Sequence, residues 1–129
     1  MSVSNKQLII DYLNALSGKP KTPEMLAPYV SDAGLLHHIA EVEAAFPSYE
    51  LIQEQTIVEG DLVALRAVFR GVHRGTFAGM PATGKVVSTG LIIIYRIADS
   101  RIADHWMQLD ALGLMQQLQP ASPTEMAAA

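Results

Sequence analysis

Residues 86–109, VVSTGLIIIYRIADSRIADHWMQL, predict two long β-strands joined by a tight turn. The first part, 86–97, is rich in β-branched residues, and the last part, 101–109, continues the two-residue period of a strand. Between them, Ala98-Asp99-Ser100 has the small and polar residues that favour a turn. Strands joined by so short a turn run antiparallel, which points to a sheet built from hairpins.

The segment before this hairpin has the same period. Residues 49–58 predict a strand, Glu59-Gly60-Asp61 a tight turn, and 62–74 a second long strand. Residues 75–84 contain three Gly and one Pro, which favours a long hairpin connection into the strand at 86–97. The pattern therefore predicts a four-stranded antiparallel meander.

The N-terminal third has the 3.6-residue period of helices instead. Residues 5–17 carry one apolar stripe, and a second, short helix is predicted from the N-cap Thr22 through Val30. A third helix is predicted over 33–46, and a short C-terminal helix over 111–117. The helices thus precede the sheet instead of alternating with its strands.

This order favours an α+β fold, in which N-terminal helices pack on the concave face of a strongly curved antiparallel sheet. We expect residues 1–119 to form one domain and residues 120–129 to form a flexible tail. A curved sheet covered by helices leaves a pocket between the two layers, and such a pocket is the expected place for a small ligand.

Composition narrows the classes of partner. Half of the 129 residues are hydrophobic, the formal net charge is −4, and the nine Lys and Arg are scattered, so neither nucleic acid nor a membrane is an expected partner. The chain has no Cys, which excludes disulfides, thiolate nucleophiles and zinc–thiolate sites. The N-terminus lacks a signal-peptide pattern, and the run Leu91–Tyr95 is too short to span a bilayer. A cytoplasmic protein is expected.

Three motifs, in this order, resemble one known family. They are Gly71-Val72-His73-Arg74-Gly75, the hairpin Gly79-Met80-Pro81 with Thr83-Gly84-Lys85, and the last strand Ile102-Ala103-Asp104-His105-Trp106 followed by Asp110. Over residues 5–118 the chain resembles the SnoaL-like polyketide-cyclase branch of the NTF2-like superfamily. The family has Glu where this chain has Asp104, a shorter carboxylate.

The resemblance implies cyclisation of a polyketide by intramolecular aldol condensation, without a metal or cofactor. It also implies a carboxylate acid/base near the end of the last strand, which falls on Asp110 here, and a homodimer formed through the outer face of the sheet. The expected ligand is a small apolar molecule. The alternatives are a non-catalytic NTF2-like dimer that binds such a molecule, and a structural dimer with a filled core.

The last strand supplies the first candidate residues. Four of its side chains share one parity, and we expect them to face the pocket: Asp104, Trp106, Gln108 and Asp110. Apolar neighbours of Asp110 are expected to raise the pKa of its carboxyl toward the range useful for proton transfer. Alternatively, Asp110 caps the helix that begins at Ala111. Trp106 is expected to form a flat wall for a planar ligand, or to be ordinary core.

Histidines supply the second group of candidates. His73 shares a strand face with Phe69 and is predicted to hold or polarise a substrate carbonyl, or else to form a structural hydrogen bond. His38 lies nearer than His37 to the apolar side of its helix and is predicted to reach the pocket. His105 has the opposite parity to Trp106, so a surface or dimer contact is expected for it.

Apolar side chains complete the predicted site. We expect further lining of the pocket from Phe69, and from Tyr12, Leu91 and Ile93, for which plain core packing is the alternative. The histidines match no metal-ligand spacing, so no metal is expected. The sequence therefore predicts acid/base chemistry by Asp110 and His73 on a small carbonyl compound.

Overall fold

In the computed structural model, residues 4–119 are described. Three helices precede a four-stranded sheet, and a fourth helix follows it, which confirms the predicted α+β class. The elements are α1 (Asn5–Leu16), α2 (Pro23–Leu26), α3 (Ala33–Ala45), β1 (Glu50–Glu59), β2 (Leu62–Val72), β3 (Val86–Ala98), β4 (Arg101–Leu109) and α4 (Ala111–Leu118). The tail predicted at 120–129 lies outside the described residues.

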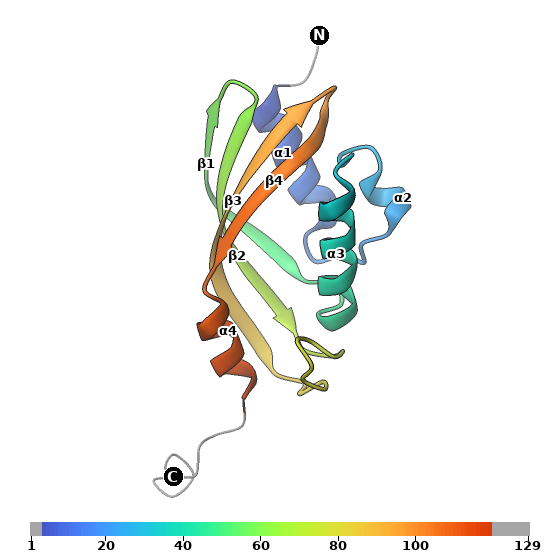
Figure 1. Ribbon diagram of the computed structural model, residues 1–129, viewed down its shortest axis with the longest axis vertical. Coiled ribbons are helices and arrows are strands. Elements are labelled where there is room, and N and C mark those ends of the chain that lie inside the picture. Colours follow the sequence, from blue (N-terminus) through green and yellow to red (C-terminus); the bar gives the residue numbers. More distant parts are fainter. Residues whose placement is uncertain (1–3, 120–129) are drawn as a thin grey trace, which may run out of the picture.

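The sheet is an antiparallel meander in the order β1-β2-β3-β4. Its long strands bend over their length, and Figure 1 shows α1, α2 and α3 together on one side of the bend, with α4 near the opposite end of the molecule from the N-terminus. Bending places part of the sheet around the helices instead of flat against them. The two layers therefore meet at some places and leave space at others.

The second helix is shorter than predicted. Helix α2 ends at Leu26, whereas the sequence pattern predicted a helix to Val30. Pro28 lies within the predicted span and has no N–H with which to continue the helical bonds. Instead, Val30 bridges Ile102 of β4, and the N–H of Ser31 donates to the carbonyl of Ile102 at 2.9 Å. This contact fixes the start of α3 against β4.

Strict alternation of burial along the central strands defines the inner face of the sheet. The inner side chains of β2 and β3 pack against the apolar stripe of α1, in which Ile9 and Leu16 are fully buried. Outer side chains such as Ile92 and Ile94 are exposed. The layer between helices and sheet is thus the core of the protein.

A β-bulge near the start of β4 reverses the parity of that strand. Ile97 pairs with Ile102, but Arg96 pairs with Asp104, so Ala103 is an extra residue without a partner on β3. Ile102 is fully buried, yet beyond the bulge the odd-numbered residues, beginning with His105, face inward. The prediction that the even-numbered side chains of β4 face the pocket is therefore wrong.

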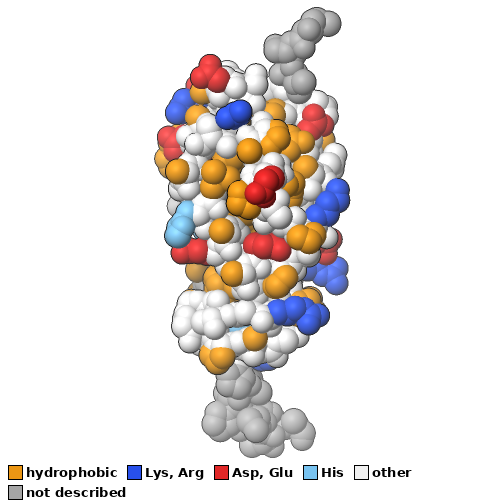
Figure 2. All heavy atoms as spheres, turned by 90° about the vertical axis from the view of Figure 1, so that its right-hand side faces the viewer, with side chains coloured by type: hydrophobic (Ala, Val, Ile, Leu, Met, Phe, Trp, Pro, Cys, Tyr) orange, Lys and Arg blue, Asp and Glu red, His pale blue; other side chains and the backbone are white. Residues whose placement is uncertain are grey.

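The surface of the protein carries a mixture of charged and apolar side chains. Figure 2 shows the helix-bearing side of the molecule, where Lys and Arg lie among acidic and apolar side chains and several of them lie along one edge of the view. Within residues 4–119, none of the helices is long and apolar enough to cross a membrane.

Candidate functional site

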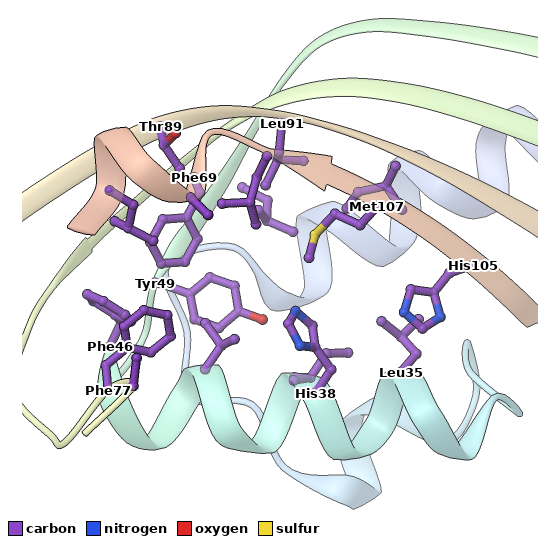
Figure 3. Close-up of a pocket in the computed structure, with 18 of the residues that line it drawn as sticks. Leu35, His38, Phe46, Tyr49, Phe69, Phe77, Thr89, Leu91, His105 and Met107 are labelled. Carbon is purple, nitrogen blue, oxygen red and sulfur yellow. The ribbon is translucent and has the colours of Figure 1, made fainter. Parts of the chain in front are cut away.

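A cavity of about 320 Å³ lies between α3 and the inner face of the sheet. Its size is at the lower end of the range for small-molecule sites. Most of its wall is apolar, and six of the lining side chains carry a polar group: Tyr12, His38, Tyr49, Thr89, Tyr95 and His105. Figure 3 shows the His105 imidazole at one end of this space, with the His38 imidazole between it and the Tyr49 hydroxyl.

The His105 imidazole is held by a carboxylate. Its Nδ1 lies 2.7 Å from Oδ2 of Asp32, and both side chains are largely buried. Burial alone would raise the pKa of Asp32, but hydrogen bonds from His105 and from the backbone at the start of α3 outweigh burial and lower it. An ionised Asp32 can only accept, so Nδ1 carries a proton, and in the neutral ring Nε2 is then the nitrogen with the lone pair.

The same carboxylate begins a helix. Oδ1 of Asp32 accepts hydrogen bonds from the N–H groups of Gly34 at 2.9 Å and Leu35 at 3.2 Å, which makes Asp32 the N-cap of α3. Each oxygen of the carboxylate therefore has its own partner, and the side chain cannot rotate without losing both. The cap fixes the orientation of the group that orients His105.

His38 enters the cavity from α3. Burial lowers its pKa below the ordinary value of 6.5, and the neighbouring His105 lowers it further, against an opposing effect of Glu41. His38 is therefore neutral at pH 7, with one donor and one acceptor nitrogen. The adjacent His37 points away and pairs with Glu41 at the surface, at 2.9 Å.

Replacing His38 is expected to change how stability depends on pH. Because the pKa is lower in the folded protein, His38 contributes stability that is present above about pH 6.5 and lost as the pH falls below it. A His38→Gln variant should therefore lose less stability than the wild type between pH 7.5 and pH 5.5. Urea denaturation at both pH values measures this, and equal losses would contradict it.

The tyrosines of the cavity can only donate or accept hydrogen bonds as neutral phenols. Burial raises the pKa of Tyr12, Tyr49 and Tyr95 well above the ordinary value of 10. At neutral pH these hydroxyl groups keep their protons and cannot act as bases. Figure 3 shows the Tyr49 hydroxyl directed toward His38.

The other end of the cavity is aromatic. The ring of Phe46 contacts those of Phe69 and Phe77 edge-on, with centroids 5.3 and 5.2 Å away. All three rings line the cavity, and Figure 3 shows them at the end opposite His105. The cavity thus has one end suited to a planar apolar group and one end suited to a polar, reacting group.

Several predicted residues lie where the sequence pattern placed them. The cavity lining contains five residues of the predicted site: Tyr12, His38, Phe69, Leu91 and Ile93. Their part in binding a ligand stays a prediction. Within residues 4–119, no group of three or more His, Asp or Glu is arranged to hold a metal ion.

His73 does not reach the cavity. It is fully buried just after β2, with its ring 5.4 Å from that of Phe46, and its Nδ1 accepts a hydrogen bond from the N–H of Thr83 at 3.2 Å. The backbone of His73 pairs with Lys85 and Gly84 on the other side of the connection. The prediction that His73 is catalytic or holds a substrate carbonyl is therefore wrong. The structural alternative holds, because the His73 ring bonds across the connection that carries Phe77.

Asp110, Trp106 and Gln108 do not face the cavity either. Trp106 is 52 % exposed, and Gln108 and Asp110 line a shallow depression on the outer face of the sheet. Oδ1 of Asp110 accepts the N–H of Gly113 at 2.9 Å, so this carboxylate is the N-cap of α4. The bulge at Ala103 explains the correction, since it turns His105 inward instead of Trp106.

Sequence reasoning overlooked Asp32 and Tyr49 and predicted a surface or dimer contact for His105. Asp32 precedes a predicted helix, and its capping role was readable from that position alone. Its contact with His105 joins residues 73 positions apart and depends on how Val30 docks on Ile102. No local pattern carries that information.

The fold and the cavity define the class of protein. An N-terminal helical layer packs in the bend of an antiparallel meander and encloses a ligand-sized pocket, which is the NTF2-like architecture. The model of the SnoaL-like polyketide cyclase family matches residues 12–118, so the chain belongs to this family, as its motifs predicted.

Individual relatives agree with this assignment. The chain is 32% identical over 116 residues to aklanonic acid methyl ester cyclase DnrD of Streptomyces peucetius, covering 89% of this chain and 77% of that protein. The structure of TsrD from Streptomyces laurentii superposes with a TM-score of 0.74 at 29% identity, covering 92% and 97% of the two chains. A SnoaL-like polyketide cyclase from Agrobacterium tumefaciens shares the fold, with a TM-score of 0.75 at 19% identity and coverages of 92% and 100%.

Proposed function

We propose that this protein catalyses a cofactor-independent proton transfer on a small, largely apolar carbonyl compound, as the first step of an intramolecular aldol cyclisation. The observation that carries the proposal is the largely buried pair of His105 and Asp32, which presents an imidazole base to a largely apolar cavity. An imidazole can remove and return a proton in general acid/base catalysis, and a largely apolar wall strengthens its interaction with a developing charge.

The proposed reaction keeps all atoms of the substrate. Nε2 of His105 removes a proton from the carbon next to a carbonyl, and the C–H electron pair moves toward the carbonyl oxygen to form an enolate. The enolate carbon attacks a second carbonyl carbon of the same molecule and forms the new C–C bond. The oxygen of that second carbonyl then takes the proton back from His105.

Asp32 and His38 have supporting roles in this scheme. Asp32 holds the tautomer in which Nε2 is free, and its negative charge stabilises the imidazolium that forms when His105 takes a proton. Neutral His38 beside it donates a hydrogen bond to the carbonyl oxygen. The aromatic end of the cavity, with Phe46 and Phe69, holds the planar part of the substrate.

The test follows the first chemical step directly. Because DnrD is named for aklanonic acid methyl ester, this compound is the first substrate to try. The wild-type protein in D₂O is expected to introduce deuterium at the carbon next to the reacting carbonyl and to release a cyclised isomer, as followed by NMR and mass spectrometry. Tight binding without either change would favour the alternative of a non-catalytic binding protein, to which the largely apolar lining is also suited.

We also propose that the outer face of the sheet forms a homodimer interface. Ile92, Ile94 and Trp106 are 51, 37 and 52 % exposed, and Ile94 pairs with Trp106 across neighbouring strands. Large apolar side chains gathered on one face are typical of a protein–protein contact. Trp is among the residue types that contribute most to such contacts.

Charging this face is expected to separate the dimer. A Trp106→Lys variant should sediment as a monomer at a concentration where the wild type sediments as a dimer, because an ammonium group cannot be buried against Ile94 without a partner. Leu112→Lys is the matched control, since Leu112 is 70 % exposed but lies on α4. A dimer that survives Trp106→Lys and dissociates with Leu112→Lys would contradict the proposed interface.

A further inference from the structure

A buried ammonium group lies behind Tyr49, outside the machinery described so far. The side chain of Lys21 has no exposed surface, and its Nζ lies 4.0 Å from the centroid of the Tyr49 ring. Nζ also donates to the backbone carbonyls of Tyr49 at 2.8 Å and Lys19 at 2.7 Å. A fully buried cation is costly and needs compensation, so its place against this one ring requires an explanation.

Partial compensation comes from Glu43 on α3. Its carboxylate lies 3.4 Å from Nζ of Lys21, and it also accepts the N–H of Ser48. Burial lowers the pKa of Lys21, and the opposing effect of Glu43, which favours the charged form, offsets this only in part. The result is a cation held between a carboxylate, two carbonyls and the face of an aromatic ring.

The Tyr49 ring is fixed on several sides. Besides Lys21, it packs against Phe69 with centroids 5.2 Å apart, and the carbonyl of Tyr49 also accepts the N–H of Gly18. Among residues 4–119, the hydrogen bonds of Tyr49 are all made by its backbone. Its hydroxyl is left for the cavity, where Figure 3 shows it directed toward His38.

An enolate oxygen needs hydrogen-bond donors that are already in place, and the proposed reaction has so far only His38. We propose that the Tyr49 hydroxyl is a catalytic donor to this oxygen, and that Lys21 is a positioning residue that holds the ring and makes the hydroxyl a stronger donor. This inference rests on the proposed function. A positive charge at the ring face withdraws electron density from the phenol, which strengthens its O–H as a donor.

Kinetics of α-carbon exchange with aklanonic acid methyl ester test the two roles together. Tyr49→Phe is expected to lower kcat by about 10²-fold with little change in KM, as for loss of an oxyanion donor. Lys21→Met, which keeps the length of the side chain without its charge, is expected to lower kcat about tenfold. In the Tyr49→Phe background, Lys21→Met should cause no further loss, because no hydroxyl remains to be strengthened.

Glu43→Gln separates positioning from simple structural support. Gln keeps the shape and an acceptor for Ser48, but it removes the negative charge that opposes Lys21. A kcat equal to or above that of the wild type is expected. The role of Lys21 would be overturned if Glu43→Gln lowered kcat as much as Lys21→Met does. It would also be overturned if Lys21→Met lowered kcat tenfold in the Tyr49→Phe background. This variant also tests the idea if Lys21→Met does not fold.

A binding probe makes this test independent of turnover. 4-Nitrophenol absorbs differently as phenol and phenolate, so its spectrum reports how well the cavity stabilises an oxyanion. Tyr49→Phe and Lys21→Met are each expected to weaken phenolate binding about tenfold, with nitrobenzene, which lacks the oxygen, bound within about twofold of the wild type. If the protein does not exchange the α-carbon proton but phenolate binding falls in this way, the Tyr49 hydroxyl is still an oxyanion donor, and the proposed function is wrong. Unchanged phenolate binding in Tyr49→Phe would overturn the donor.

Discussion

A His105→Asn variant is expected to lose exchange of the α-carbon proton by about 10²–10⁴-fold, the usual contribution of a general base. The Asn amide can take the place of Nδ1 and still donate to Asp32, so the cap of α3 is preserved. Nothing in the variant replaces the lone pair of Nε2. The measurement is the rate of deuterium incorporation from D₂O, with circular dichroism to verify the fold.

Asp110→Asn is the matched control for this prediction. Asn is as good an N-cap as Asp, so α4 should keep its start, and exchange should stay within about twofold of the wild-type rate. A large loss with Asp110→Asn and full activity with His105→Asn would refute the proposed base. It would return the acid/base role to the carboxylate that the family resemblance favours.

The largest loss of stability is expected for Gly75→Ala. A Cβ at this position would overlap the carbonyl oxygen of Ala44, which is backbone at the end of α3 and cannot rotate away. The N–H of Gly75 also donates to the carbonyl of Ala45, which holds the two segments together. We expect a loss of about 3 kcal/mol, at the upper end for overpacking, and a melting temperature lower by roughly 10 °C.

Gly90→Ala provides the comparison. Gly90 lies in β3, and a Cβ there would meet no atom within 4 Å, so the variant should melt within about 2 °C of the wild type. Equal melting temperatures for the two variants would show that the end of α3 can move away from residue 75. The hairpin that brings Phe77 to the cavity would then be less firmly anchored than these contacts imply.

This packing explains what the Gly-x-His-x-Gly motif does here. Gly71 lies against Phe46, His73 stacks beside the same ring, and Gly75 lies against the backbone of Ala44. Small residues are required where two backbones approach closely, and the buried ring between them joins the hairpin to α3. The sequence motif was a reliable guide to the family, but its histidine has a structural position.

The fold was predictable because its signals are local. Periodicity located the four strands and three of the helices to within two residues, and only α2 was overextended, across Pro28. Much of the cavity lining was predictable too, since helix stripes and strand alternation place Tyr12, Phe69 and Leu91 on inner faces.

The chemical end of the site was not predictable in the same way. One unpaired residue, Ala103, decides whether His105 or Trp106 faces inward, and no Gly or Pro marks that bulge in the sequence. The partners Asp32 and His105 meet only after α3 has docked on β4. The burial of Lys21 was not predicted, because lysine side chains are generally exposed.

Asp32 has two structural roles, and this limits where the cavity can be widened to bind a larger ligand. One oxygen begins α3 and the other orients the imidazole, so any loosening of the first turn of this helix also frees the ring to rotate and to change tautomer. A conformation in which the cavity is wider at the start of α3 would bind a larger ligand, but His105 would no longer be oriented for catalysis. Substitutions that enlarge the cavity for a bulkier ligand, whether selected or designed, would therefore have to be made at its aromatic end.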